Sequence, residues 1–443
     1  MPLDYIQERW GRRRVDHDAN SVLSGRSIVG RLGPFGHRAF VVYWVGGMLS
    51  NIGTWVQNVA GSVFVYDLTG SAFAVGLLNF ATFLPTFLFS VAGGVLSDRF
   101  DRRAIVIATQ TVSLLIASAL AVAVATGGAT ELQVIATAFA LQTSWSIAKP
   151  SMIAILPALV PRGQLAEAVG LNTLQFITGQ IVGPILATVV LTTGGYAWAF
   201  AINAMTFVGP LLAMAYLYRC GLGRGVSREA VRAAAAAARF GLAAYMRAQP
   251  WVVSALLAVI STSAILEVIR TTAPVLVTQR LGLPSTDTGL VVAAMSAGSA
   301  FGLLAFIPLR TRDISRKMPA IGLLLEAAGL GLTSVATTLP MAVIGVFAIG
   351  VGFSFCFPIV TGVLQTEVPD ALRGRLMSFH QMAHLGNRPF IALAAAAIAA
   401  TFGLPAACIA GLALVPLGLI AVRSTWRGVD VAASLAPAVA SSA

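Results

Sequence analysis

The chain has 443 residues, of which 57% are hydrophobic and only 10% are charged, and its mean hydropathy is +0.84. Soluble domains carry roughly 25% charged residues, so this composition excludes a water-soluble fold. The net charge of +12 would suit a nucleic-acid binder, but most arginines lie in short loops between apolar segments, which is typical of membrane proteins, and we expect no nucleic-acid partner.

Residues 1–37 are polar and basic and predict a cytoplasmic N-terminal tail. Apolar stretches then recur, each close to the ~20 residues that cross a hydrocarbon core of ~30 Å. Their lengths predict an all-α membrane protein with about twelve transmembrane helices. The first six spans cover residues 38–65, 72–97, 103–126, 131–156, 166–191 and 195–218. The other six cover residues 250–276, 287–309, 317–337, 341–364, 372–397 and 402–423.

Two stretches outside the spans have their own character. The central loop, 219–249, separates an N-terminal bundle at 38–218 from a C-terminal bundle at 250–423. Its alanine run, Ala233 to Ala238, favours a short surface helix, and a plain linker is an equally good interpretation. The tail at 424–443 is rich in alanine, and we expect it to be cytoplasmic and disordered.

Basic residues predict the orientation. With twelve spans, one side of the membrane receives nearly all loop arginines, among them Arg99, Arg102, Arg103, Arg162, Arg310, Arg312, Arg373 and Arg423. The other side receives only Arg280. The positive-inside rule then makes both termini cytoplasmic in a multi-pass protein of the inner cell membrane, with the lipid bilayer as its surroundings.

The two halves of the chain look related by a shift of 208 residues. Gly94 falls on Gly302, Arg102 on Arg310 and Pro150 on Pro358, at matching ends of matching spans. An internal repeat of this kind predicts two pseudo-symmetric six-helix bundles with a substrate site between them near the midplane.

Polar side chains recur at helical spacing in two spans of the first half. The first span offers Asn51, Trp55 and Asn58, and the fourth offers Gln142 and Ser146, followed by Lys149. Each set lies on one helix face, and both are candidates to line a polar cavity. The second span carries three phenylalanines, Phe80, Phe83 and Phe87, which we expect to face lipid.

The sharpest motif lies between the second and third spans, where residues 94–103 read GVLSDRFDRR. It resembles the loop motif of the major facilitator superfamily, G-x-L-x-D-R-x-G-R-R/K, with Asp101 in place of the later glycine. The resemblance implies the major facilitator fold and a conformational latch that closes the cytoplasmic side against span eleven in the outward-facing state. The latch residues would be Gly94, Asp98, Arg99, Arg102 and Arg103. The alternative is ordinary positive-inside charge.

The fifth span resembles the antiporter motif of the same superfamily, G-x8-G-x3-G-P-x2-G-G. Its matching residues are Gly170, Gly179, Gly183 and Pro184, and Ala187 and Thr188 replace the last two glycines. In the superfamily this motif marks exporters more than importers. The alternative is a Gly-Pro kink that serves helix packing only.

Two further stretches, Ser50–Trp55 and Lys149–Pro161, resemble the branch of macrolide-efflux and enterobactin-exporter-like carriers. One feature of drug:proton antiporters is missing. Their fourth span usually has an arginine three residues before a glutamine, and here Phe139 stands in that position before Gln142. This departure puts the usual account of proton coupling in doubt.

Ionisable residues inside the second half are costly to bury and suggest a functional cavity. In span seven, Glu267 and Arg270 lie one turn apart and can pair. In span eleven, His380, His384 and Arg388 form a stripe, and Glu326 lies in span nine. The proton-coupling candidates are Glu267, Arg270, His384 and Arg388, with Glu267 first. Helix–helix hydrogen bonds or charges reaching the headgroups are the alternatives.

Taken together, these features predict a secondary active transporter that exports an amphipathic small molecule, such as a drug, a macrolide-like compound or a siderophore, by proton antiport with alternating access. The sequence has no P-loop and neither HExxH nor G-x-S-x-G, which argues against nucleotide-driven transport and a membrane enzyme. The alternatives are a nutrient importer and a receptor or scaffold. The three cysteines form no metal or disulfide pattern, so we expect no metal site. We also expect no cofactor and a monomer.

Overall fold

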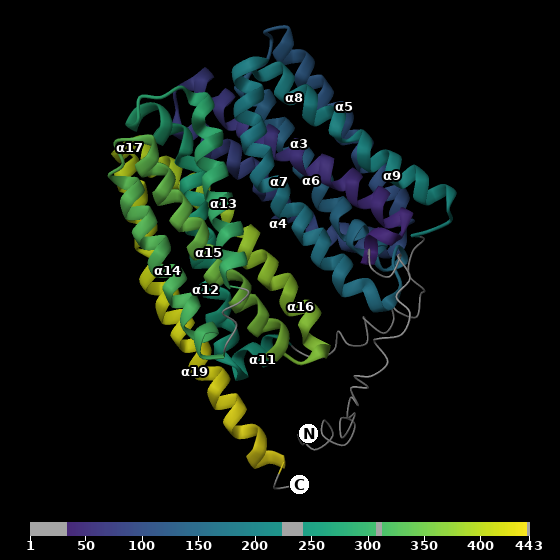
Figure 1. The fold of residues 1–443 in the computed structure, drawn as a ribbon, viewed down its shortest axis with the longest axis vertical. Helices are drawn as coiled ribbons and strands as arrows, with labels where there is room; N and C mark the ends of the chain where they lie inside the picture. The colour runs from purple at the N-terminus through teal and green to yellow at the C-terminus, as the bar shows by residue number, and fades with distance from the viewer. Residues whose placement is uncertain (1–32, 224–241, 307–311, 441–443) are drawn as a thin grey trace.

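The computed structural model describes residues 33–223, 242–306 and 312–440, and the regular elements in these ranges are helices. They form two helical bundles that lie side by side (Figure 1). The chain is therefore an all-α membrane protein with the major facilitator fold, as the sequence predicted. Residues 1–32 of the predicted N-terminal tail and the predicted surface helix at 232–239 lie outside the described ranges.

The N-terminal bundle follows a short 3-10 turn at Gly33–Gly36 and contains seven helical segments within the described residues. Short sequence signals determine where these helices begin and end. Gly70, at φ 62°, ends the first helix, and Thr130 and Gln133 form a reciprocal capping box at the start of another. The segments are α3 (Arg38–Thr69), α4 (Ala72–Arg99), α5 (Arg102–Ala125), α6 (Glu131–Ile155), α7 (Leu165–Thr193), α8 (Gly195–Thr206) and α9 (Val208–Arg219).

The C-terminal bundle repeats this plan with two additional π-helical turns. The turns are η4 (Leu276–Arg280), at the end of α12, and η7 (Met382–Gly386), between α16 and α17. The helices are α11 (Leu242–Ala248), α12 (Pro250–Val275), α13 (Thr288–Phe306), α14 (Arg312–Ser334), α15 (Leu339–Glu367), α16 (Asp370–Gln381), α17 (Arg388–Phe402), α18 (Leu404–Leu412) and α19 (Leu414–Ala440), with a 3-10 turn η5 at Ser285–Asp287.

Ten of the twelve predicted spans coincide with helical stretches of the described residues that are long and apolar enough to cross a membrane. The two remaining predicted spans coincide with α6 and α14, whose polar side chains lower their hydropathy; α14 begins with Arg312 and contains Lys317 and Glu326. Both helices nevertheless pack inside their bundles, α6 against α4 and α14 against α15.

The C-terminal tail differs from the prediction, because the last helix does not stop at residue 423. Helix α19 continues to Ala440 and projects beyond the bundle, where Figure 1 shows it as the yellow helix near the C-terminus. Alanine has the highest helix propensity of the amino acids, so an Ala-rich extension of an existing helix continues it without a new nucleus. The expectation of disorder in this tail was therefore wrong up to Ala440.

The internal repeat has a counterpart in packing. In the N-terminal bundle, a Cβ on Gly93 of α4 would lie 2.7 Å from the carbonyl oxygen of Ser146 on α6. In the C-terminal bundle, Gly302 of α13 makes the corresponding approach to Ser354 of α15, at 3.0 Å from its Cβ. Ser146 and Ser354 are separated by the predicted 208 residues. The close contact in α4 belongs to Gly93, one residue before the position that the 208-residue shift pairs with Gly302, and a Cβ added at Gly94 would meet no atom within 4 Å in this conformation.

The two bundles are joined at the end of the molecule opposite the free end of α19 (Figure 1). Tyr66 accepts hydrogen bonds from Thr278 and Gln279, at 3.0 and 2.9 Å, and Asp67 accepts one from Ser285 at 2.9 Å. Small residues bring the helices together at two places nearby. A Cβ on Gly76 of α4 would overlap Ala396 of α17, and a Cβ on Gly289 of α13 would lie 2.5 Å from the Pro184 carbonyl oxygen of α7.

Candidate functional site

A cavity lies between the bundles next to this closed end. Residues of α3 and α4 line one side, and residues of α12 and α13 line the other. The lining is mixed, with amide and hydroxyl groups beside aromatic rings and two charged side chains. Its residues are Trp55, Asn58, Val59, Ser62, Asn79, Thr82, Phe83, Glu267, Arg270, Thr288 and Val292. Four residues that the sequence singled out, Trp55, Asn58, Glu267 and Arg270, thus meet at one cavity.

A hydrogen-bonded chain crosses the cavity from one bundle to the other. The Asn79 amide on α4 donates to the Thr271 hydroxyl on α12 at 3.2 Å, and that hydroxyl donates to Oε1 of Glu267 at 3.3 Å. Thr271 lies four residues after Glu267, so one helix turn places its hydroxyl over the carboxylate. A change in the charge of Glu267 would therefore be felt directly at a contact between the two bundles.

The ion pair of Glu267 is not the predicted one. Its partner is Arg388 of α17, whose Nε lies 4.0 Å from Oε2 of Glu267, and the sequence predicted Arg270 instead. Glu267 is fully buried and Arg388 is 5% exposed. Helix spacing made the Arg270 pair possible, but the packing of α17 against α12 brings a second arginine to the carboxylate.

Arg270 points into the cavity and lies over an aromatic ring of the other bundle. Its guanidinium carbon is 4.9 Å from the ring centroid of Trp55 on α3, a cation–π contact. The buried Nε and Nη1 atoms of Arg270 have no hydrogen-bond partner in the described structure. Arg388 makes a similar contact with Phe83 of α4, at 5.2 Å. Both arginines thus connect the charged cluster to the N-terminal bundle.

His384 continues this cluster away from the cavity. It lies in the π-helical turn η7, and such turns are frequent at functional sites because they re-aim side chains. Arg388 Nη2 lies 3.4 Å from Nε2 of His384, and a guanidinium can only donate, so Nε2 accepts. In the neutral ring Nδ1 then carries the proton and donates to the Ser263 hydroxyl at 2.7 Å. His380 bonds to Thr361 of α15 instead.

Three predicted cavity residues lie elsewhere. Asn51 packs against α7, where a Cβ on Gly179 would be 3.0 Å from the Asn51 Cβ. Gln142 and Ser146 of α6 bond to the Thr86 hydroxyl of α4, at 2.8 and 3.3 Å. These polar groups are used for helix packing inside the N-terminal bundle, because each finds a hydrogen-bond partner or close neighbour there.

The glycine motif of α7 contacts both bundles. A Cβ on Gly183 would overlap the Cβ of Trp55, and Gly179 packs on Asn51, so both glycines hold α7 against α3. The next residue, Pro184, meets Gly289 of the other bundle through its carbonyl. Gly170 is exposed, and a Cβ added to it would meet no atom within 4 Å. This glycine of the motif therefore makes no close helix contact in this conformation.

Two arginines of the loop motif, Arg102 and Arg103, make contacts within the N-terminal bundle in this conformation. Arg102 donates to the Ala154 carbonyl at 2.8 Å. Arg103 pairs with Asp101 at 2.7 Å and lies 4.5 Å from the Tyr218 ring of α9. Hydrogen bonds from the Arg103 guanidinium lower the pKa of the Asp101 carboxyl. Asp101, which replaces the superfamily glycine, thus caps α5 and orients Arg103.

Sequence reasoning missed Asn79, Thr271 and Phe83 as site residues. Phe83 was expected to face lipid, but it lines the cavity and contacts Arg388. Phe80 and Phe87 also face α17, where Phe390 lies 6.2 and 6.5 Å from their ring centroids. Asn79 could have been identified from the sequence as a site residue, because it is a polar residue in an apolar span. Nothing local distinguished Phe83, because a phenylalanine suits lipid and protein surfaces equally.

Glu326 is a second buried carboxyl, and it lies apart from the cavity. It is fully buried on α14, contacts the Thr262 hydroxyl of α12 through Oε1, and has an unpartnered Oε2. Among the described residues, no group of three or more histidine, cysteine or acidic side chains is arranged to hold a metal ion.

Known proteins resemble this chain over most of its length. Residues 29–439 match the family described as transmembrane secretion effectors. The enterobactin exporter EntS of Citrobacter koseri is 25% identical over 354 residues, which cover 77% of this chain and 80% of that protein. EntS of Salmonella typhimurium is 24% identical over 399 residues, covering 87% and 91%.

Solved structures show the same fold at low identity. A POT family transporter in complex with a thioalcohol-conjugated peptide superposes with a TM-score of 0.70 at 11% identity, covering 89% of this chain and 97% of that one. A bacterial homologue of the iron transporter ferroportin gives a TM-score of 0.68 at 16% identity, covering 88% and 98%. These structures show the fold alone, and the match to the family identifies the chain as a multi-pass membrane transport protein and not an enzyme.

Proposed function

This chain belongs to the family of transmembrane secretion effectors, and we propose on that premise that it exports a small molecule across the inner membrane by alternating access. One observation carries the proposal. Among the described residues, the hydrogen bonds between the bundles gather at and beside one end, from Tyr66 and Asp67 down to Asn79, above a cavity with buried charges. Alternating access requires such a site, closed on one side at a time.

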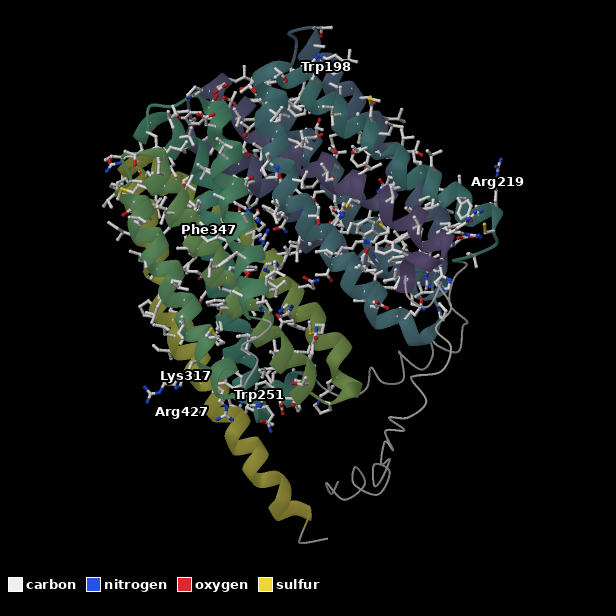
Figure 2. All side chains as sticks on the ribbon, in the orientation of Figure 1. Trp198, Arg219, Trp251, Lys317, Phe347 and Arg427 are labelled. Atoms are coloured by element: carbon white, nitrogen blue, oxygen red, sulfur yellow. The ribbon has the colours of Figure 1, made fainter. Side chains whose placement is uncertain are left out.

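The proposed orientation places both termini in the cytoplasm. Figure 2 shows Lys317 and Arg427 near the end toward which α19 projects, and Trp198 at the opposite end. The exposed Arg247 lies in the last turn of α11, which Figure 1 shows near the same end. By the positive-inside rule this end is cytoplasmic, so the described conformation is closed toward the outside. An exporter in this conformation would take up its substrate from the cell.

Proton antiport is the proposed source of energy, with Glu267 as the carboxyl that changes charge. The charged groups around it are Arg270 on its own helix and Arg388 on α17, and beyond Arg388 lie the titratable ring of His384 and the amine of Lys149. Protonation of Glu267 would remove the negative charge that faces Arg388 and alter the Thr271–Asn79 link between the bundles. Loss of these interactions would change the relative stability of the two facing states.

We propose that the two sequence motifs stabilise opposite closed states of the transport cycle. We propose that Gly94, Asp98, Arg99, Arg102 and Arg103 form a cytoplasmic latch in the outward-facing state. Arg102 and Arg103 make contacts within the N-terminal bundle in the present conformation, and we propose that the latch forms when the bundles tilt. The α7 motif, through Gly183 and Pro184, supports the opposite closed end.

The proposed substrate is an amphipathic molecule such as a siderophore, a drug or a macrolide-like compound, carried by a monomer. The named relatives export enterobactin, which supports a siderophore, and the cavity offers aromatic and hydrogen-bonding groups together. Import of a nutrient is the competing function, and the match to secretion effectors argues against it.

The experiment compares cells that overproduce the protein with cells that lack it, measuring macrolide resistance and catecholate siderophore release. Overproduction should raise one or both. In inverted membrane vesicles, the compound identified should accumulate when the lumen is acidified. A matched variant, Asp67→Cys with Ser285→Cys in a cysteine-free background, should stop transport when cross-linked and regain it after reduction. Unchanged transport in the cross-linked protein would exclude alternating access.

A further inference from the structure

We infer that the cavity between the bundles is built for a substrate with an anionic group attached to an aromatic or apolar body. This inference names the substrate class of the proposed exporter and rests on that function for the direction of movement. The binding step itself needs only the charges and contacts of the described cavity.

The first step is the balance of fixed charge. Two arginines, Arg270 and Arg388, surround one carboxylate, Glu267, and arginine stays protonated in proteins. The cavity lining contains no other acidic residue. The site is therefore positive by at least one unit when Glu267 is ionised, and more positive when it is protonated.

The second step concerns the hydrogen-bond partners and the neighbouring charges of each arginine. Arg388 has Glu267 at 4.0 Å and donates to His384 at 3.4 Å, so its charge is partly compensated, although its Nε and the Oε2 of Glu267 also have no hydrogen-bond partner among the described residues. Arg270 has the face of Trp55 but no hydrogen-bond acceptor for its buried Nε and Nη1 atoms. Unfilled donors on a partly buried guanidinium are costly. A carboxylate pairs with two adjacent nitrogens of a guanidinium, Nε with Nη2 or Nη1 with Nη2, so one oxyanion would fill one of the two unpartnered nitrogens together with Nη2. Arg270 therefore lacks the partner that an anionic ligand would bring.

The third step is the surface next to Arg270. Trp55 and Phe83 offer aromatic contacts, and Val59 and Val292 extend the apolar lining. Asn58 and Ser62 add hydrogen-bonding groups on the α3 side. A small inorganic anion would leave the aromatic and aliphatic surface uncovered. An organic acid with a ring or chain beside its anionic group would use both parts of the site.

An anionic substrate would also provide export with a driving force that needs no proton. Moving one charge through the membrane potential changes the free energy in proportion to that potential, and an inside-negative potential drives anions outward. The proposed proton exchange and the proposed charge of the substrate are therefore separable. Binding tests the second without the first.

The test uses two dyes of similar size and opposite charge, dansylglycine and dansylcadaverine. Their equilibrium binding to the purified full chain in lipid nanodiscs is followed by energy transfer from tryptophan to the dansyl group. We expect the acid to bind at least tenfold more tightly than the amine. Arg270→Gln should weaken the acid about tenfold or more, as expected for loss of a charged hydrogen bond, and leave the amine unchanged or tighter.

Two controls separate charge from folding. Arg270→Lys keeps the charge and should retain most of the preference for the acid. Arg423→Gln removes an exposed arginine far along α19 and should behave as the unaltered protein. Equal binding of both dyes, a preference for the amine, absence of saturable binding of the acid, or an Arg270→Gln protein that melts normally and keeps the preference would each overturn the inference.

Transport separates this inference from the proposed function. If the acid binds through Arg270 but does not accumulate in inverted vesicles under either a potential or a pH gradient, the anion site stands and the export proposal fails. If vesicles accumulate the amine and ignore the acid, export stands and the anion site is wrong.

Discussion

Arg388 of α17 lies 4.0 Å from Glu267 of α12, measured from Nε to Oε2, and the same guanidinium lies over Phe83 of the opposite bundle at 5.2 Å. The ion pair is thus internal to the C-terminal bundle, but its arginine also forms part of the contact between bundles. A charge change at Glu267 has a direct route to that contact, which is the physical basis for the coupling role proposed for this residue.

Replacement of Glu267 by glutamine should weaken the pH dependence of efflux. The amide keeps the shape and can still accept from Thr271, but it cannot gain or lose a proton. We expect efflux rates in vesicles to become nearly independent of pH across the neutral range. Glu326→Gln, a buried carboxyl outside the cavity, is the matched control and should keep the pH profile. An unchanged profile in Glu267→Gln would remove this residue from the coupling role.

Replacement of Asp98 by asparagine should slow transport by tenfold or more at normal protein abundance, a loss of about 1.4 kcal/mol or more in the latched state. The reason is the proposed latch, in which a carboxylate at this position favours the outward-facing state. The measurement is initial transport rate per amount of folded protein. Normal turnover would contradict the latch.

Replacement of Asp101 by asparagine isolates the ion pair with Arg103, because asparagine remains a good N-cap for α5. Since the Asp101 pKa is lowered in the folded protein, its carboxylate stabilises the fold at neutral pH. This contribution is fully present above the unfolded-state pKa and is lost as pH falls through the folded-state pKa.

We therefore expect Asp101→Asn to cost about 0.5–1.5 kcal/mol at neutral pH and almost nothing in acid, since a charged hydrogen bond with a partly exposed partner is of that size. Melting of the detergent-solubilised protein at several pH values checks this. A destabilisation that persists unchanged in acid would show that the charge is not its cause.

Replacement of Gly183 by alanine should destabilise the N-terminal bundle by about 1–3 kcal/mol, because the added methyl group would overlap Trp55. Gly170→Ala is the control in the same helix and motif, and its exposed position leaves room for the methyl group. The comparison is made by thermal melting and transport. Equal stability of the two variants would show that the contact with α3 is not tight.

Replacement of Gly76 by valine should force α4 and α17 apart at the closed end, since no side chain fits against Ala396. The population open at this end should rise, which spin labels at Gly128 and Thr338 would report as a longer distance. Gly331→Val, at an open helix position, should leave the distance distribution unchanged. An unaltered distribution in Gly76→Val would mean that this contact does not set closure.

The secondary structure and the membrane setting of this protein follow from the sequence alone. Span length and hydropathy are local properties, so they determined the helices, the membrane setting and the two bundles. The motifs at 94–103 and 170–184 indicated the superfamily because they are contiguous in the chain. The low hydropathy of α6 and α14 and the helical continuation of α19 into the tail also follow from local composition and helix propensity.

The site depended on tertiary structure. Sequence spacing places Arg270 one turn from Glu267, but it does not give the rotation of α12 or the approach of α17, so it could not identify Arg388 as the partner. For the same reason Gln142 and Ser146 turn to α4, while Phe83 turns to the cavity. Each helix presents a full circle of side chains, and only packing against its neighbours decides which of them meet.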